Sequence, residues 1–234
     1  MFTHIYNTRY GDYKDYDTVK VGTVLDIVQD ISTKEAESCG YGINKLREIN
    51  IAWLMQGINV RFEKPVKISK PIEVSTAIKS LKGVISERGC LLKQDGEIVA
   101  KTIANWFTFD TKKMRACRVP KEMHDCYTCY DFKDSFFEYV RPAILEIEKP
   151  KYVVRVGNKD LDTNKHLNNQ KAADLLMDAL PYEFDFNNLG ILYKKAAYLG
   201  DELEVCVKEI EKGYYVHLQT NESQVCVAGV FEKL

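Results

Sequence analysis

The chain has 234 residues, of which 45% are hydrophobic and 29% are charged, and its formal net charge is −1 at pH 7. A chain of this length can bury a substantial core as one large domain or two small ones. The balanced charge excludes a general attraction to nucleic acid or to an anionic membrane surface.

Three features indicate the cellular compartment. No stretch approaches the roughly 20 uninterrupted apolar residues that span a bilayer, so we expect no membrane span. Residues 1–17 are polar and rich in tyrosine, unlike a secretory signal. The cysteines are seven, an odd number, and most lie in apolar runs, which favours free thiols over a disulfide framework. Together these features predict a cytoplasmic protein.

One segment, HDCYTC at 124–129, has residue types that bind metals. Cys126 and Cys129 form a C-x-x-C pair, with His124 before it and Cys117 upstream. A structural zinc site normally has two well-spaced ligand pairs, and the second pair is missing here. We therefore expect thiols in a connecting segment, and neither a metal nor a cofactor.

The first half of the chain predicts one helix followed by four strands. Apolar residues recur at i, i+3, i+4 and i+7 from Val24, which predicts a helix over 24–38. Turn signals separate the apolar runs that follow, and Asp95-Gly96 is a strong hairpin signal. The runs predict strands at 52–62, 71–81, 84–94 and 97–109.

The second half repeats this order. A strand-like run at 151–157 precedes a helix pattern over 172–179, and further strand-like runs follow at 190–199, 202–211, 214–221 and 224–234. This repetition predicts an α+β fold with two equivalent domains, each a long helix wrapped by an antiparallel sheet. The expected boundaries are 1–110 for the first domain, 111–148 for a linker and 149–234 for the second domain.

A short motif is also repeated. KDYDTVKV at 14–21 aligns with KDLDTNKH at 159–166, with five identities in eight positions, and each copy precedes a helix pattern. In this alignment Asp17 matches Asp162, whereas valines of the first copy face Asn164 and His166. If these two residues served the fold alone, both copies would need them, so the difference points to chemistry.

Asp162, Asn164 and His166 follow one another at intervals of two. In an extended segment they would point to one side, toward the start of a helix whose unpaired amides suit a developing oxyanion. Histidine exchanges a proton near neutral pH, and a carboxylate can orient its ring. The set suits attack of water on an activated acyl carbonyl. The alternative is a polar turn with Asn168 or Asn169 as a helix cap.

The stretch DLDTNKHLNN at 160–169 resembles the hallmark D-x-N-x-H-x-N-N of the acyl-acyl carrier protein (acyl-ACP) thioesterases, a plant and bacterial family with two tandem hotdog domains. The resemblance covers nearly the whole chain, including its length, its doubled order of elements and its linker. It implies hydrolysis of fatty acyl-ACP thioesters, with release of free fatty acid and termination of chain elongation. It places the catalytic residues at Asp162, Asn164 and His166.

The sequence departs from the family at one point. The family commonly continues with a YRREC-like stretch, whose glutamate is implicated in activating water and whose cysteine was once proposed as a nucleophile. Here the matching stretch is YKKAA at 193–197, with Ala196 at the glutamate and Ala197 at the cysteine. A cysteine nucleophile at this position is therefore excluded.

Two mechanisms stay open. In the first, His166 takes a proton from water, Asp162 orients the imidazole, and Asn164 holds the water or the carbonyl. In the second, Asp162 acts directly as a base or nucleophile. A slightly shifted alignment would let Asp201 or Glu202 supply the missing carboxylate.

The expected substrate is a fatty acyl chain linked by phosphopantetheine to an acidic acyl carrier protein. The residues expected to bind this substrate are Asn168, Asn169 and Trp53, with the acyl tail in the apolar-rich first half. A basic surface would dock the acidic carrier. A homodimer of the chain is a further possible assembly. The candidate groups for docking are Lys64, Lys67 and Lys70; Lys112, Lys113 and Arg115; and Lys194 and Lys195.

Two other functions fit the same fold. One is an acyl-CoA thioesterase, and the other is a catalytically weak acyl-binding protein, which Ala196 favours. A dehydratase of similar fold is disfavoured, because the histidine lies in a water-activating motif. Fold alone does not choose among these activities.

Overall fold

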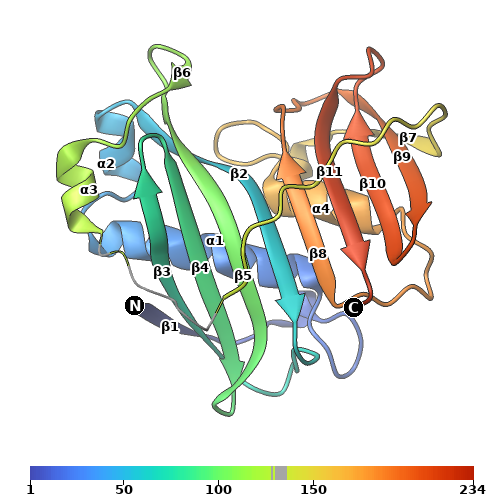
Figure 1. Ribbon diagram of the computed structural model, residues 1–234, viewed down its shortest axis with the longest axis horizontal. Coiled ribbons are helices and arrows are strands. Elements are labelled where there is room, and N and C mark those ends of the chain that lie inside the picture. The colour runs from blue at the N-terminus through green and yellow to red at the C-terminus, as the bar shows by residue number, and fades with distance from the viewer. Residues whose placement is uncertain (128, 130–135) are drawn as a thin grey trace. The chain divides into compact units, whose positions relative to one another are not determined.

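The computed structural model describes residues 1–127, 129 and 136–234, and these divide into two compact units, Met1–Tyr139 and Val140–Leu234 (Figure 1). Residues 128 and 130–135, which belong to the expected linker, lie outside the described residues. Each unit combines an antiparallel sheet with one principal helix, so the predicted α+β class is confirmed. No helix in the described part of the chain is long and apolar enough to cross a membrane.

The sheet of the first unit has the strand order β1-β3-β4-β5-β2, with the short β6 paired to β5. Neighbouring strands are antiparallel throughout. Asp95 and Gly96 both have positive φ angles, of 52° and 79°, at the hairpin between β4 and β5. The strands are β1 (Phe2–Tyr6), β2 (Ile51–Phe62), β3 (Ile72–Lys82), β4 (Ile85–Gln94), β5 (Glu97–Asp110) and β6 (Arg115–Ala116).

Helix α1 (Val21–Ser38) packs against the sheet of the first unit and contacts β3. The predicted apolar face of this helix is buried, since Val24 and Ile31 have no exposed surface. Two short helices were not predicted, α2 (Ile43–Glu48) and α3 (Lys121–Cys126). Helix α2 buries no residue, so it has no apolar stripe to reveal it in the sequence.

The second unit has the strand order β8-β11-β10-β9-β7, again with antiparallel neighbours. Its principal helix is α4 (Asn169–Met177). The strand predicted over 190–199 ends at Tyr193, because the Lys194 and Lys195 amides both donate to the Cys226 carbonyl and leave the ladder. The strands are β7 (Tyr152–Arg155), β8 (Asn188–Tyr193), β9 (Glu202–Ile210), β10 (Gly213–Gln219) and β11 (Val225–Glu232).

Candidate active site

The predicted catalytic residues lie in a tight turn, residues 161–167, which we call the motif loop. Oδ1 of Asp162 accepts the main-chain N–H groups of Asn164 at 2.7 Å and of His166 at 3.0 Å. The Asp162 N–H donates to the His166 carbonyl at 2.8 Å, and Lys165 has a φ of 63°. This is the side-chain turn that aspartate commonly closes. The expectation of an extended segment is therefore wrong, because the Asp162 side chain folds the backbone back on itself.

In this turn Asp162 binds main-chain amides, whereas it was expected to orient the imidazole of His166. Among the described residues, no hydrogen bond joins its carboxylate to the imidazole of His166. Asp162 instead fixes the main chain on either side of Asn164. Asp162 and His166 are half-buried and Asn164 is exposed, so the loop presents its polar side chains to solvent.

Asn168 caps helix α4. Its Oδ1 accepts the N–H groups of Gln170 at 2.8 Å and Lys171 at 3.3 Å, so the predicted asparagine cap is confirmed at this position. These two amides are therefore occupied by the cap, although a helix-start amide was expected to stabilise an oxyanion. The Asn168 N–H donates to the Asp160 carbonyl at 2.8 Å, which draws the motif loop onto the helix.

The neighbouring residue, Asn169, is held from β8. The hydroxyl of Tyr193 donates to the Asn169 carbonyl at 3.0 Å. Burial raises the pKa of Tyr193, so the hydroxyl keeps its proton and remains a donor. The first turn of α4 is thus tied both to the motif loop and to the sheet.

Residues 194–198, which we call the flanking segment, run beside the motif loop. The Ala197 carbonyl accepts the Leu167 N–H at 2.8 Å, and Tyr198 forms an isolated β-bridge with His166. Ala197 is buried and Ala196 is exposed. The segment that resembles YRREC therefore lies next to the motif, but it contributes a methyl group where the family has a carboxylate.

The two alternative carboxylates have other positions. Oδ2 of Asp201 accepts the Tyr198 N–H at 2.8 Å and so closes the turn at the end of the flanking segment. Glu202 is exposed at the start of β9, opposite Arg155 of β7.

Tyr198 was not singled out in the sequence analysis. In the sequence it is one aromatic residue before a Gly-Asp turn, and nothing there indicates its contact with His166.

The two units share the backbone frame that leads into their principal helices. Asp12 accepts the Arg9 N–H at 2.7 Å, and Asp160 accepts the Gly157 N–H at 2.8 Å. After each of these two aspartates, the main chain passes through a loop into the principal helix of that unit. One loop is closed by a hydrogen bond from the Lys14 N–H to the Thr18 carbonyl, and the other by the bond from Asp162 to His166.

This frame corrects the sequence alignment of the two motifs. Asp162 matches Lys14 rather than Asp17, and His166 matches Thr18. The alignment was displaced in register because it followed the shared letters K-D-x-D-T instead of the hydrogen bonds. In the first unit Asp15, the residue after Lys14, accepts the N–H groups of Asp17 at 2.8 Å and Thr18 at 2.7 Å, so both loops are closed by an aspartate. What is particular to the second unit is Asn164 and His166, since Thr18 takes the position of His166.

Trp53, expected to bind substrate, lies on β2 in the first unit. It is half-buried and packs on a small cluster formed by Ile78, Met123 and Tyr127. Burial raises the pKa of Tyr127 to about 12. The surroundings of Trp53 are thus apolar, as a fatty acyl chain would require.

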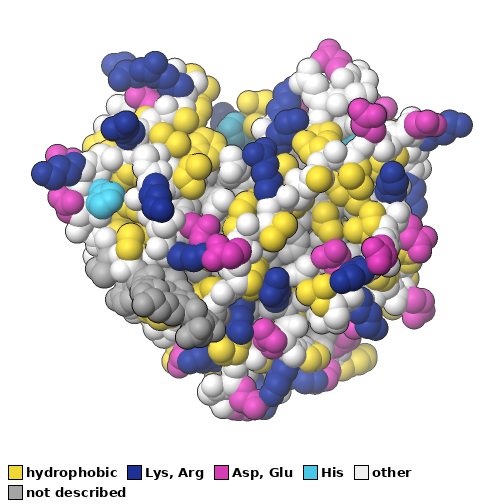
Figure 2. Space-filling model, in the orientation of Figure 1, with side chains coloured by type: hydrophobic (Ala, Val, Ile, Leu, Met, Phe, Trp, Pro, Cys, Tyr) yellow, Lys and Arg dark blue, Asp and Glu magenta, His cyan; other side chains and the backbone are white. Residues whose placement is uncertain are grey.

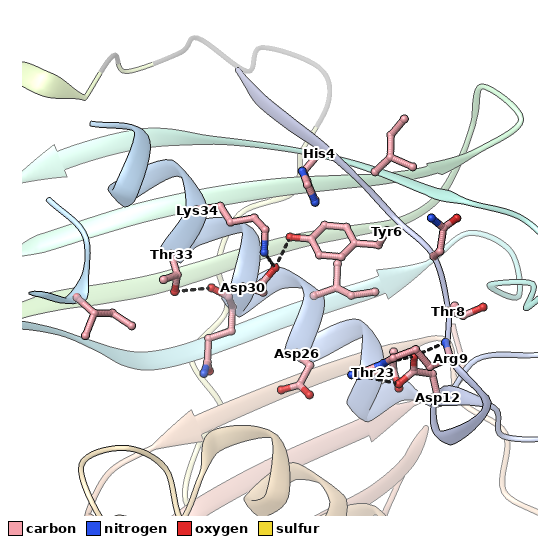
Figure 3. Close-up of a pocket in the computed structure, with 15 residues that line it drawn as sticks. His4, Tyr6, Thr8, Arg9, Asp12, Thr23, Asp26, Asp30, Thr33 and Lys34 are labelled. Atoms are coloured by element: carbon pink, nitrogen blue, oxygen red, sulfur yellow. Dashed lines mark hydrogen bonds and ion pairs between the residues drawn. The ribbon is translucent and has the colours of Figure 1, made fainter. Parts of the chain in front are cut away.

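A groove of about 760 Å³ lies between β1 and α1 in the first unit (Figure 3). The Tyr6 hydroxyl donates to Asp30 at 2.8 Å, and Asp30 also pairs with Lys34. Arg9 pairs with Asp12 at 3.3 Å at the far end of the groove. Covering these charged groups with an acyl tail would remove their water, which is costly, so this groove does not suit a fatty chain.

Comparison with protein families covers most of the chain. Residues 1–127 match the acyl-ACP thioesterase N-terminal domain, and residues 143–230 match the acyl-ACP thioesterase C-terminal domain. The chain belongs to the acyl-ACP thioesterase family. The activity of this family is hydrolysis of the fatty acyl-ACP thioester, which makes the chain a thioester hydrolase. The resemblance seen in the motif is thereby confirmed.

Solved structures of this family have the same fold at low sequence identity. An acyl-ACP thioesterase from Bacteroides thetaiotaomicron has a TM-score of 0.87 at 18% identity, covering 99% of this chain and 96% of its own. The 12:0-ACP thioesterase from Umbellularia californica has a TM-score of 0.84 at 15% identity, covering 99% of this chain and 96% of its own. The predicted pair of hotdog domains is confirmed.

Smaller proteins match part of the chain. A Staphylococcus aureus protein solved in complex with CoA has a TM-score of 0.53 at 10% identity, and it covers 60% of this chain and 95% of its own. No curated protein sequence matches the chain.

Proposed function

We propose that this acyl-ACP thioesterase hydrolyses fatty acyl-ACP with Asp162, Asn164 and His166 as its catalytic set. The observation that supports the proposal is the closed motif loop: an aspartate closes the matching loop of the first unit as well, but only the second unit has an asparagine and a histidine there, at Asn164 and His166. The products are free fatty acid and carrier thiol, and their release ends elongation of the acyl chain.

In this reaction His166 is the general base. It takes a proton from water as the water oxygen attacks the thioester carbonyl, and Asn164 holds the carbonyl or the water. The C–S bond then breaks, and the proton on His166 passes to the pantetheine sulfur. Asp162 supports both residues through the two amides that it binds.

The second mechanism, in which Asp162 attacks the carbonyl, would form an anhydride between its carboxylate and the acyl chain. The bonds from two amides to Oδ1 already assign that oxygen to the loop, which favours His166 as the base. Trapping with hydroxylamine in a single turnover separates the mechanisms. An anhydride would yield a fatty acyl hydroxamate or a hydroxamate at Asp162, whereas direct attack of water leaves no acyl group on Asp162 to trap.

A docking surface for the acidic carrier is proposed at Lys194 and Lys195, with Lys165 of the motif loop. All three are exposed and lie in the motif loop or the flanking segment. The Lys195 ammonium contacts the neutral amide of Gln224, and among the described residues no carboxylate pairs with any of the three. Unpaired cations beside the catalytic set can attract an acidic partner.

The other docking candidates are largely neutralised. Lys64 pairs with Glu97 at 2.6 Å, and Lys67 and Lys70 pair with Asp17 and Asp95. Lys113 contacts Asp110 at 3.6 Å. Basic and acidic side chains are also interspersed over the face shown in Figure 2. These pairs weaken the local positive field that docking of a carrier needs.

Charge reversal tests the docking surface. The K194E/K195E variant should raise KM for acyl-ACP about tenfold or more, leave kcat unchanged, and leave KM for the uncharged acyl-pantetheine unchanged. The matched control is K64E/K70E, which should change KM for acyl-ACP less than twofold. An equal rise in KM from both pairs would remove the assignment to Lys194 and Lys195.

A thioesterase that acts on acyl-CoA is the second candidate, and the likeness to the Staphylococcus aureus structure with CoA favours it. Release of free thiol from acyl-ACP and acyl-CoA, over a range of chain lengths, compares the two. The proposal requires the higher kcat/KM on acyl-ACP. Turnover of acyl-CoA alone would support the second candidate, and tight binding without turnover would support the weak acyl-binding protein that Ala196 favours.

We propose the cytoplasm as the site of this reaction, since the free thiols and the composition fit a reducing compartment. Trp53, with its apolar surroundings, stays a proposed residue for the acyl tail, and Asn168 and Asn169 stay proposed substrate-binding residues. The homodimer is tested by light scattering of the purified chain.

A further inference from the structure

The ring of Tyr198 packs on the imidazole of His166. The two ring centroids are 5.1 Å apart and the planes meet at 87°, which is an edge-to-face contact. The main chains of the same two residues form a β-bridge. The bridge therefore fixes the backbone of both residues in the contact, although Tyr198 is 52% exposed.

Asp201 holds Tyr198 from the other side. Its Oδ2 accepts the Tyr198 N–H at 2.8 Å, and its own N–H donates to the Tyr198 carbonyl at 3.1 Å. Between them Gly200, with a φ of 89°, donates to the Val156 carbonyl at 2.9 Å. A glycine permits the left-handed backbone that this turn needs. The carboxylate, the turn and the bridge therefore fix the backbone from which the tyrosine ring projects.

The first unit provides an internal comparison. There Thr18 and Lys67 form the bridge that His166 and Tyr198 form in the second unit. The Lys67 ammonium pairs with Asp17 instead of packing on its bridge partner. The shared backbone frame therefore does not itself require an aromatic pair. The pair occurs in the unit whose loop also has the polar catalytic residues.

We propose that Tyr198 is a positioning residue for His166, and that Asp201 acts through Tyr198. This inference rests on the proposed function. A half-buried imidazole at the surface can rotate about its side-chain bonds, and an edge-to-face partner limits that rotation. Orientation of a general base strongly affects the rate, because a small misplacement lengthens the path of proton transfer. The need is greater here because Ala196 gives the site no second carboxylate.

Three variants separate positioning from folding. Y198L removes the aromatic face and should lower kcat for acyl-ACP about tenfold or more with KM within about twofold. Y198F retains the ring and should restore kcat to within about twofold of the wild type. Y182L is the matched control, since Tyr182 is fully exposed in the same unit, and it should leave kcat and KM unchanged.

NMR gives a readout that does not depend on activity. The chain has four histidines, and the H166A variant identifies the ring protons of His166 by their loss. Y198L should shift these protons as the ring current of the tyrosine disappears, whereas Y198F and Y182L should not. The same spectra should show D201A moving the His166 signals in the direction of Y198L, with D201N between them and the wild type.

Each outcome decides the inference. Unchanged His166 signals in Y198L would show that the contact does not exist. Shifted signals with an unchanged kcat would show a contact without a positioning role. An equal loss of kcat in Y198F and Y198L would assign the effect to the hydroxyl. If the wild type hydrolyses no acyl thioester, the proposed function fails, while the NMR shifts still test whether Tyr198 holds the ring.

Discussion

One carboxylate oxygen of Asp162 closes the motif loop, so this residue has a structural role in addition to any role in catalysis. A hydrogen bond from a backbone amide to a carboxylate is stronger than one between neutral groups, and Asp162 accepts two. The aspartate of the motif therefore has a structural contribution that does not depend on any proton transfer. The hydrogen bonds to Asp162 hold the main chain of Asn164 and His166 in place.

The proposed roles predict different effects for two substitutions at Asp162. D162N retains an acceptor oxygen for both amides, so kcat should stay within about tenfold of the wild type. D162A opens the loop and should lower kcat more than a hundredfold, in the range that a misplaced base costs. Steady-state kinetics on acyl-ACP checks both. If D162N were as inactive as D162A, the charge itself would be essential and Asp162 would be the base or nucleophile.

Ala196 predicts a gain of activity at the residue scale. Its side chain is exposed in the flanking segment, so A196E can be accommodated without disturbing the core. A carboxylate here would stand where the family has one, and we expect kcat to rise about tenfold through better activation of water. A196Q has the same shape without the charge and should leave kcat unchanged. An identical response of both variants would mean that position 196 does not reach the water.

At the scale of elements, the two principal helices begin differently. Asn168 caps α4 with its side chain, whereas Lys20, at the same position before α1, makes no side-chain cap. The start of α4 has to be ordered because it follows the motif loop. The first turn of α1 is instead stabilised by burial of its apolar face.

The cap predicts a measurable loss of stability. N168A should lower the free energy of unfolding by about 1 kcal/mol, and N168S, which can still cap, should lower it by much less. K20A is the matched position without a cap and should change the free energy by a few tenths of a kcal/mol. Urea denaturation of the three variants measures these differences. Equal losses from N168A and K20A would show that the cap contributes nothing.

The sequence predicted the elements better than their registers. Helix periodicity located α1 and α4, and turn signals located the long strands, because both depend on local chemistry. The strand ending at Tyr193 and the pairing of the two motif copies depend on hydrogen bonds between distant segments. The contact between His166 and Tyr198 is of the same kind, since a bridge joins residues far apart in the chain. The three polar residues of the motif were singled out by their residue types and stay a prediction, whereas the turn that holds them was not predicted.

For the whole molecule, a buried histidine links stability to pH. His217 of β10 is 1% exposed, and its ring contacts the Tyr215 hydroxyl at 3.2 Å and Oε1 of Gln219 at 3.0 Å. Burial lowers the pKa of His217 below its ordinary value of 6.5. The folded chain thus holds this ring neutral, whereas the unfolded chain takes up a proton as the pH falls below about 6.5.

Protonation of the unfolded state therefore destabilises the fold in mild acid. The contribution of His217 is fully present above pH 6.5 and is lost as the pH falls toward its lowered pKa, at up to about 1.4 kcal/mol per pH unit. H217Q should show a smaller loss of unfolding free energy between pH 7.5 and pH 5.5 than the wild type. H4Q, at an exposed position, is the control and should follow the wild type. Parallel curves for H217Q and the wild type would contradict this linkage.

Hydrolysis of fatty acyl-ACP by the second unit, with His166 as the base, is tested by kcat/KM of the H166A variant. The matched control is T18A, at the equivalent bridge position of the first unit. We expect H166A to lose a hundredfold or more of kcat/KM on acyl-ACP, as removal of a general base does, while T18A stays within about twofold. An H166A enzyme that retains kcat/KM within threefold of the wild type would rule out His166 as the base.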